Sequence, residues 1–85
     1  MKQQKTLYIV TSYAMKNGGV AEDEMQGFET LRSAEDSFSF LVESASENHP
    51  DWIEDDENQK HYFCLYAADN FTENRVEIQL RKVYV

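Results

Sequence analysis

The segment that most constrains the fold runs from Ser33 to Asn48 and has the spacing of an amphipathic helix. Its apolar residues recur at intervals of three and four, so they form one stripe on a helix of about 3.6 residues per turn. The stripe consists of Ala34, Phe38, Leu41 and Ala45, with Val42 at its margin. Ser33 is the expected N-cap. Pro50 disfavours helical geometry at His49, so we expect the helix to end there.

Three further segments have the alternation of β-strands. Residues 6–15 carry apolar side chains on both faces, which predicts an interior strand. Residues 61–68 are also apolar on both faces, whereas in residues 75–85 Val76, Ile78 and Leu80 alternate with polar side chains. Only residues 69–74 separate the last two segments. We therefore expect them to form an antiparallel hairpin.

A fourth strand is less clearly encoded. The sequence Lys16-Asn17-Gly18-Gly19 favours a tight hairpin turn, because Asn and Gly tolerate positive φ angles. Residues 20–31 would then return as a strand, although their acidic middle is poor strand material and Gly27 suggests a bulge or break. The alternative is a loop that ends in a short strand over residues 27–31.

These elements predict one α+β domain over residues 1–85, with two layers. An antiparallel sheet of three or four strands would carry one helix on one face. The order is β-β-α-β-β, or β-α-β-β if residues 20–31 form a loop. Residues 51–60 are expected to be a charged loop that Trp52 and Ile53 hold against the core.

Charge is distributed unevenly along the chain. The net charge is −8, and all but three of the 16 acidic residues lie between Ala21 and Glu57, where Arg32 is the only base. Such a surface disfavours direct binding to nucleic acid or to an anionic membrane, since both require basic patches. It favours a basic protein partner. The simpler interpretation is that these acids only keep the protein in solution.

The candidate partner-binding residues combine this charge with two aromatic side chains. They are Glu22, Asp23, Glu24, Asp36, Phe40, Glu43, Glu47, Trp52, Glu54, Asp55, Asp56 and Glu57. On a helical wheel Phe40 lies with the acids and not on the apolar stripe, which suits an interface anchor. Two alternatives remain open: the Trp52 segment folds back over Phe40, or Trp52 is simply a core anchor.

The uncovered face of the sheet offers a second surface. If Leu7, Ile9, Phe63 and Leu65 face the helix, the opposite face carries Tyr8, Val10, Tyr62, Cys64 and Tyr66. A tyrosine-rich face of this kind suggests a homodimer through Tyr8, Tyr62 and Tyr66. Tyrosines also tolerate half-exposed positions, because their hydroxyl groups stay hydrated. Two alternatives therefore remain: this face forms a homodimer, or its tyrosines are simply exposed to solvent.

The sequence holds no pattern for catalysis, a cofactor or a metal. His49, His61 and Cys64 lack the spacing of a zinc site. Cys64 lies in apolar company, where thiols are usually inert. The acidic run at residues 51–57 lacks the glycine and the alternating ligands of a calcium loop. We therefore expect a protein that is not an enzyme and has no cofactor and no metal.

Two function classes follow. The first is a small acidic protein-binding module, in one form an inhibitor or nucleic-acid mimic that occupies a basic surface of its partner. The alternative is a structural or assembly module, homodimeric through the tyrosine-rich face, with no catalytic activity. The chain has no run of about 20 apolar residues, which a membrane-spanning helix requires. With a single cysteine, the expected location is the cytoplasm.

Overall fold

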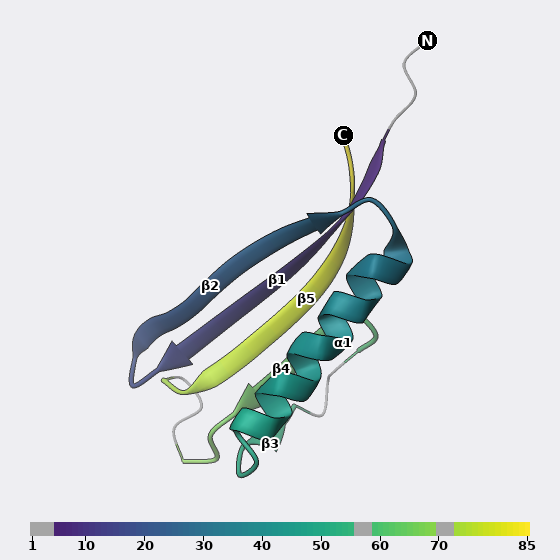
Figure 1. Cartoon of the computed structure of the whole chain (residues 1–85). Coiled ribbons are helices and arrows are strands. Elements are labelled where there is room, and N and C mark those ends of the chain that lie inside the picture. Colours follow the sequence, from purple (N-terminus) through teal and green to yellow (C-terminus); the bar gives the residue numbers. More distant parts are fainter. Residues whose placement is uncertain (1–4, 56–58, 70–72) are drawn as a thin grey trace.

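The computed structural model describes residues 5–55, 59–69 and 73–85. In these ranges the chain forms five strands and one helix: β1 (Thr6–Lys16), β2 (Gly19–Phe28), α1 (Leu31–Asn48), β3 (Ile53–Glu54), β4 (Tyr62–Tyr66) and β5 (Arg75–Tyr84). Every strand pairing is antiparallel, and the strand order is β2-β1-β5-β4-β3. The helix packs along one face of this sheet (Figure 1). The predicted α+β fold is therefore confirmed.

The strand count is higher than the three or four predicted. The additional strand is β3, where Ile53 pairs with Tyr66 and Glu54 pairs with Leu65, inside the segment expected to be a loop. Two residues are too few for a periodic signal, so the sequence pattern could not reveal this strand. None of the helices in the described residues is long and apolar enough to cross a membrane.

The uncertain strand forms as β2, although it ends at Phe28 and not at residue 31 as predicted. The hairpin turn before it explains why it forms. Asn17 has φ of 53° and Gly18 has φ of 81°, the positive values that a two-residue turn requires. Pairing with β1 then runs from Lys16 with Gly19 to Tyr8 with Phe28. The register shift lies between Ala14 and Met15 and not at the predicted Gly27.

The N-cap of the helix is Thr30, three residues before the predicted Ser33, so α1 begins at Leu31. Thr30 is extended, with φ of −122° and ψ of 147°. Its Oγ1 accepts a hydrogen bond from the backbone N–H of Ser33 at 3.2 Å, which satisfies one of the free donors of the first turn. At the other end α1 stops at Asn48, as the His49-Pro50 pair predicts.

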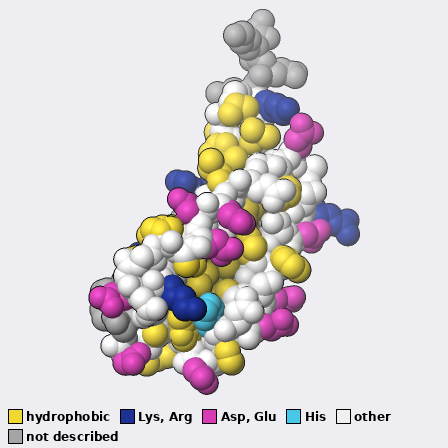
Figure 2. Space-filling model, turned by 60° about the vertical axis from the view of Figure 1, so that its left-hand side comes forward, with side chains coloured by type: hydrophobic (Ala, Val, Ile, Leu, Met, Phe, Trp, Pro, Cys, Tyr) yellow, Lys and Arg dark blue, Asp and Glu magenta, His cyan; other side chains and the backbone are white. Residues whose placement is uncertain are grey.

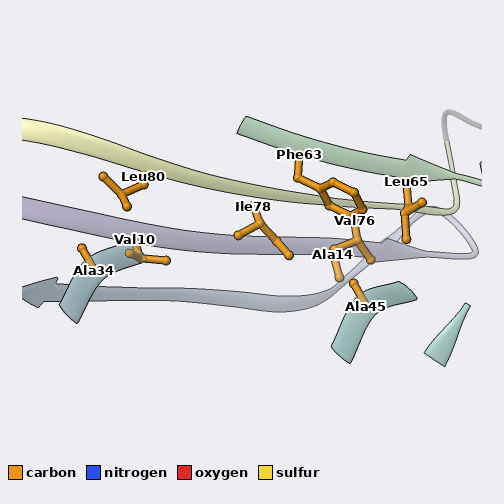
Figure 3. Packing of buried hydrophobic residues seen from close by; sticks show 9 residues of the cluster. All are labelled: Val10, Ala14, Ala34, Ala45, Phe63, Leu65, Val76, Ile78 and Leu80. Carbon is orange, nitrogen blue, oxygen red and sulfur yellow. The ribbon is translucent and has the colours of Figure 1, made fainter. Parts of the chain in front are cut away.

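The core lies between α1 and the middle of the sheet. Its buried members are Val10, Ala14, Ala34, Ala45, Phe63, Leu65, Val76, Ile78 and Leu80 (Figure 3). Ile78 in β5 is the most enclosed large side chain, at 1% exposure. The two buried helix residues, Ala34 and Ala45, are small, so α1 approaches the sheet closely there.

The predicted orientation is correct for β4 and β5 and wrong for β1. Val10 pairs with Leu80, and Ser12 pairs with Ile78, so these residues of β1 face the helix. Leu7 and Ile9 consequently lie on the other face, since side chains alternate along a strand. Both residue sets of β1 are partly apolar, so the alternation could not decide between them.

Candidate functional site

A groove of about 480 Å³ lies between α1 and the outer strand β2. It is lined by Val10, Ser12, Glu24, Met25, Gln26, Ser37, Phe40 and Leu41. A smaller hollow of about 130 Å³ shares Ser12 and Leu41 with the groove and adds Glu22 and Ser44. In Figure 1 α1 lies beside β5 and β4, whereas β2 is the edge strand on the other side of β1.

The side chains on the two flanks of α1 account for this offset. Towards β4 the helix presents Phe38 and Val42, which pack against the core. Glu35 on the same flank is hydrogen-bonded to His61, with its Oε2 2.9 Å from the ring Nε2. Towards β2 the flank carries the short side chains of Ser37 and Ser44, which line the hollows and do not fill them.

Phe40 stands bare at the rim of the groove, with 67% of its surface exposed. The interpretation that the Trp52 segment covers it is wrong. Trp52 instead stacks on His49, with ring centroids 3.8 Å apart and planes 14° from parallel, and it packs against the core. Burial lowers the pKa of His49, and the nearby charge of Lys16 lowers it further. Trp52 is not among the residues that line the groove.

Carboxylates flank the groove on both sides. On β2, Glu22 and Glu24 pair with Ala14 and Ser12, so they share the face that the helix covers. Ser12 Oγ also donates a hydrogen bond to Glu22 Oε2 at 3.5 Å. On the helix, Asp36, Glu43 and Glu47 lie four residues before and three and seven after Phe40, which places them on the same exposed side.

Figure 2 brings the β2 side of the molecule forward. Acidic side chains stand on both sides of a strip of hydrophobic surface in this view. The groove therefore has an apolar and hydroxyl floor and an acidic border. These features suit a ligand that combines positive charge with aliphatic or aromatic groups.

The structure brings some of the predicted residues together and separates others. Glu24 and Phe40 line the groove, and Glu22 lines the hollow beside it. Asp36, Glu43 and Glu47 line neither, and lie on the exposed side of α1 that carries Phe40. Asp23 lies on β2 but on the opposite face of the sheet, because it pairs with Tyr13.

Two of the predicted acids, Glu54 and Asp55, lie away from the groove. Glu54 belongs to β3, at the far edge of the sheet. Asp55 follows it, and its backbone N–H donates to the carbonyl of Cys64 at 3.0 Å. Asp56 and Glu57 lie outside the described residues. Membership of the acidic run at residues 51–57 therefore does not place a residue at the groove.

Several groove residues were missed by sequence reasoning. Ser12, Gln26 and Ser37 line it, but none of them stands out by composition or motif. Met25 at the rim has 75% of its surface exposed. Two sequence features together could have indicated the groove: polar residues at alternate positions of β2, and serine residues along one side of the helix. Their use requires knowing that β2 is a strand beside α1.

The other face of the sheet carries Tyr62, Cys64 and Tyr66, as predicted, but not Tyr8. Tyr8 pairs with Phe28 and Lys82 on the helix side, and the tyrosine that joins the uncovered face from β1 is Tyr13. This correction follows from the same reversed orientation of β1.

Polar contacts hold the uncovered face together. The Tyr62 hydroxyl donates to Glu77 Oε1 at 2.9 Å, and Arg75 contacts the other oxygen of Glu77 at 3.3 Å. Burial and the hydrogen bond to Glu77 raise the pKa of Tyr62 to about 12. Burial also raises the pKa of the Cys64 thiol, which keeps the less reactive protonated form.

Within the described residues there is no group of three or more His, Cys, Asp and Glu side chains able to hold a metal ion. Comparison of the chain with protein-family models, curated proteins and solved structures gives no match. What the protein does must therefore be inferred from its own geometry and charge.

Proposed function

We propose that the protein is a binding module that holds a basic segment of a partner protein at the acidic groove between α1 and β2. The observation that carries this proposal is Phe40. A large aromatic side chain with 67% of its surface exposed stands among carboxylates, beside a groove with an apolar floor. Exposed aromatic residues of this kind are typical anchors of protein interfaces.

The groove supplies both parts of such an interaction. Covering the exposed part of Phe40 would contribute about 1–2 kcal/mol, a fraction of the value for complete burial. The aliphatic stems of lysine or arginine can lie on its ring while their charged ends reach the carboxylates of Asp36 and Glu43. The net charge of −8 would also speed the approach of a basic partner at low ionic strength.

One form of this function is an inhibitor that takes the place of nucleic acid. A basic surface that normally holds phosphates also attracts carboxylates. The acidic rows on β2 and α1 support this form because they flank one continuous surface. The general function requires only that the partner be basic.

Affinity capture with two charge-matched variants tests the proposal. The first variant, Asp36→Asn/Glu43→Gln/Glu47→Gln, removes three charges beside Phe40. The second, Glu29→Gln/Asp51→Asn/Asp69→Asn, removes three charges elsewhere. We expect the wild-type protein and the second variant to capture the same basic partner in about 50 mM salt and to lose it in about 500 mM salt. The first variant should capture much less than the wild-type protein already at low salt.

Capture that ignores salt, or that is equal for the two variants, contradicts the proposal. Phe40→Ser separates the anchor from the charge, because it leaves every carboxylate in place. We expect this variant to lose most of the captured partner even at low salt.

The second candidate function is a homodimeric assembly module, and the uncovered face of the sheet supports it. Val20 and Ile53 pair with Met15 and Tyr66 on that face and are 61% and 43% exposed. Light scattering at micromolar concentration distinguishes the two candidates. A dimer that Tyr66→Asp or Tyr62→Asp disrupts favours assembly, whereas a species of 10.0 kDa removes it.

A further inference from the structure

We propose that the basic segment binds as an extended strand along the free edge of β2 and becomes the outermost strand of the sheet. This proposal rests on the proposed function and adds to it the conformation and position of the bound segment. Strand addition of this kind uses backbone hydrogen bonds for affinity and alternating side chains for specificity.

The two edges of the sheet differ in their capacity to accept a strand. β2 is an edge strand of ten residues, and no strand among the described residues lies on its outer side. Its residues are exposed from Gly19 to Gly27. The opposite edge, β3, has two residues. Only β2 is long enough to template a partner strand of ordinary length.

The register identifies the backbone groups that point outward. Lys5 and Val85 exchange hydrogen bonds of 3.1 and 2.8 Å, so Lys5 directs its backbone groups towards the C-terminal strand. The side to which the backbone N–H and C=O groups point alternates from residue to residue along a strand. The backbone groups of Val10 and Ser12 therefore point towards β2. Their partners on β2, Gln26 and Glu24, therefore bond to β1.

In the residues that alternate with Glu24 and Gln26 along β2, the backbone N–H and C=O groups point the opposite way. The N–H and C=O groups of Asp23, Met25 and Gly27 consequently point away from β1, towards the free edge. An added strand has a donor and an acceptor at each of these three positions.

Charge selects the occupant of this edge. Glu22, Asp23 and Glu24 are consecutive on β2, so carboxylates project on both faces of the sheet at its edge. Two copies paired through this edge would bring like charges together, which is unfavourable. A strand rich in lysine or arginine would meet opposite charge on both faces. Its side chains on the helix side would lie next to Glu22 and Glu24, at the border of the groove.

Amide hydrogen exchange in the wild-type protein tests the proposal. The probe is an end-capped synthetic peptide that alternates lysine and threonine and matches the ten residues of β2. Binding at low salt should slow exchange at Asp23, Met25 and Gly27 by about tenfold or more, because these amides gain partners. The amides of Glu24 and Gln26 already bond to β1 and should change much less.

The possible outcomes separate the two proposals. A peptide that binds without slowing exchange at the three outward amides contradicts strand addition and leaves the binding function standing. A peptide that does not bind at low salt contradicts both. Slow exchange at these amides without peptide, together with a dimer in light scattering, shows that a second copy occupies the edge and also contradicts the proposal.

Two variants at one position provide a second test. Met25→Pro removes an outward N–H without removing a bond to β1, whereas Met25→Ala removes the side chain and keeps the N–H. We expect the proline variant to bind the peptide about tenfold more weakly than the alanine variant, as loss of a backbone hydrogen bond implies. Equal affinity contradicts the proposal. If the proline variant does not fold, the exchange experiment on the wild-type protein decides.

Discussion

The two flanks of α1 meet the sheet in different ways. Towards β4, Phe38 packs against the core, its ring lies edge-on to His61 with centroids 6.3 Å apart, and Glu35 pairs with the same histidine. Towards β2, Ser37 and Ser44 line open hollows, and Phe40 stands in solvent. One flank of the helix therefore stabilises the fold, and the other leaves a surface available for a partner.

Under the proposed function, this difference assigns stability to one flank of α1 and binding to the other. The helix contributes its apolar stripe, which contains Ala34 and Ala45, to the core. Large side chains extend this packing on one flank of the helix only. Large residues at positions 37 and 44 would occupy the hollows that Ser37 and Ser44 line. The serine residues keep them open at little cost to folding, since they remain near solvent.

The largest expected contrast comes from truncating the two phenylalanines. Phe38→Ala should lower the free energy of unfolding by about 2 kcal/mol, which is below the range for a fully buried phenylalanine because Phe38 is half-buried. Phe40→Ala should change it by less than about 0.5 kcal/mol, as expected for an exposed site. Urea unfolding of both variants measures the difference. Equal losses would show that both flanks contribute to the core.

A smaller effect is expected at Tyr62, which ties β4 to Glu77 of β5. Tyr62→Phe removes their hydrogen bond and should cost about 1 kcal/mol. The pKa of Tyr62 is raised to about 12 from an ordinary value of 10.0, so the folded protein holds this proton more tightly than the unfolded chain. The associated stability is complete below pH 10 and is lost as pH rises towards 12.

Ultraviolet titration of the tyrosines measures this pKa. Subtracting the curve of Tyr62→Phe from that of the wild-type protein isolates the late-titrating group. A Tyr62 that titrates at the ordinary value would contradict both the burial of its hydroxyl group and the hydrogen bond to Glu77.

The smallest effect is expected at Glu35. Its hydrogen bond to His61 is the largest cause that lowers the pKa of Glu35, and Lys60 and the charge of His61 add to it. A lowered pKa in the folded state gives stability that is present above the ordinary value of 4.5 and is lost as pH falls through the folded value. Unfolding of Glu35→Gln should therefore depend less on pH in this acid range than unfolding of the wild type. Asp36→Asn is the control on the solvent side, and an equal response in that variant would contradict the assignment.

Periodicity predicted the elements whose patterns are long. The helical stripe gave the core face of α1, and the alternation of Val76, Ile78 and Leu80 gave that of β5. The helical wheel also placed Phe40 correctly with the acids. The orientation of β1 was wrong because both of its residue sets are apolar. The pairing of β1 with β5, in which Val10 lies opposite Leu80, determines which face of β1 is turned to the helix.

The groove could not be predicted, because it depends on how elements are placed relative to one another. It requires that β2 be a strand and that α1 lie off it. Acids of the same acid-rich segment, residues 21–57, also separate in space: Glu24 lies on one edge of the sheet and Glu54 on the other. Composition indicated an acidic surface, and only the strand order shows which acids share a groove.

The most direct test of the binding surface is a nuclear magnetic resonance titration of the labelled wild-type protein with the lysine–threonine peptide in low salt. Binding at the groove predicts the largest shift changes along β2 and at Ser37 and Phe40, with little change at Tyr62 and Tyr66 on the opposite face. Raising the salt concentration should reverse these changes. Changes centred on the tyrosine face, or none at all, would contradict the account.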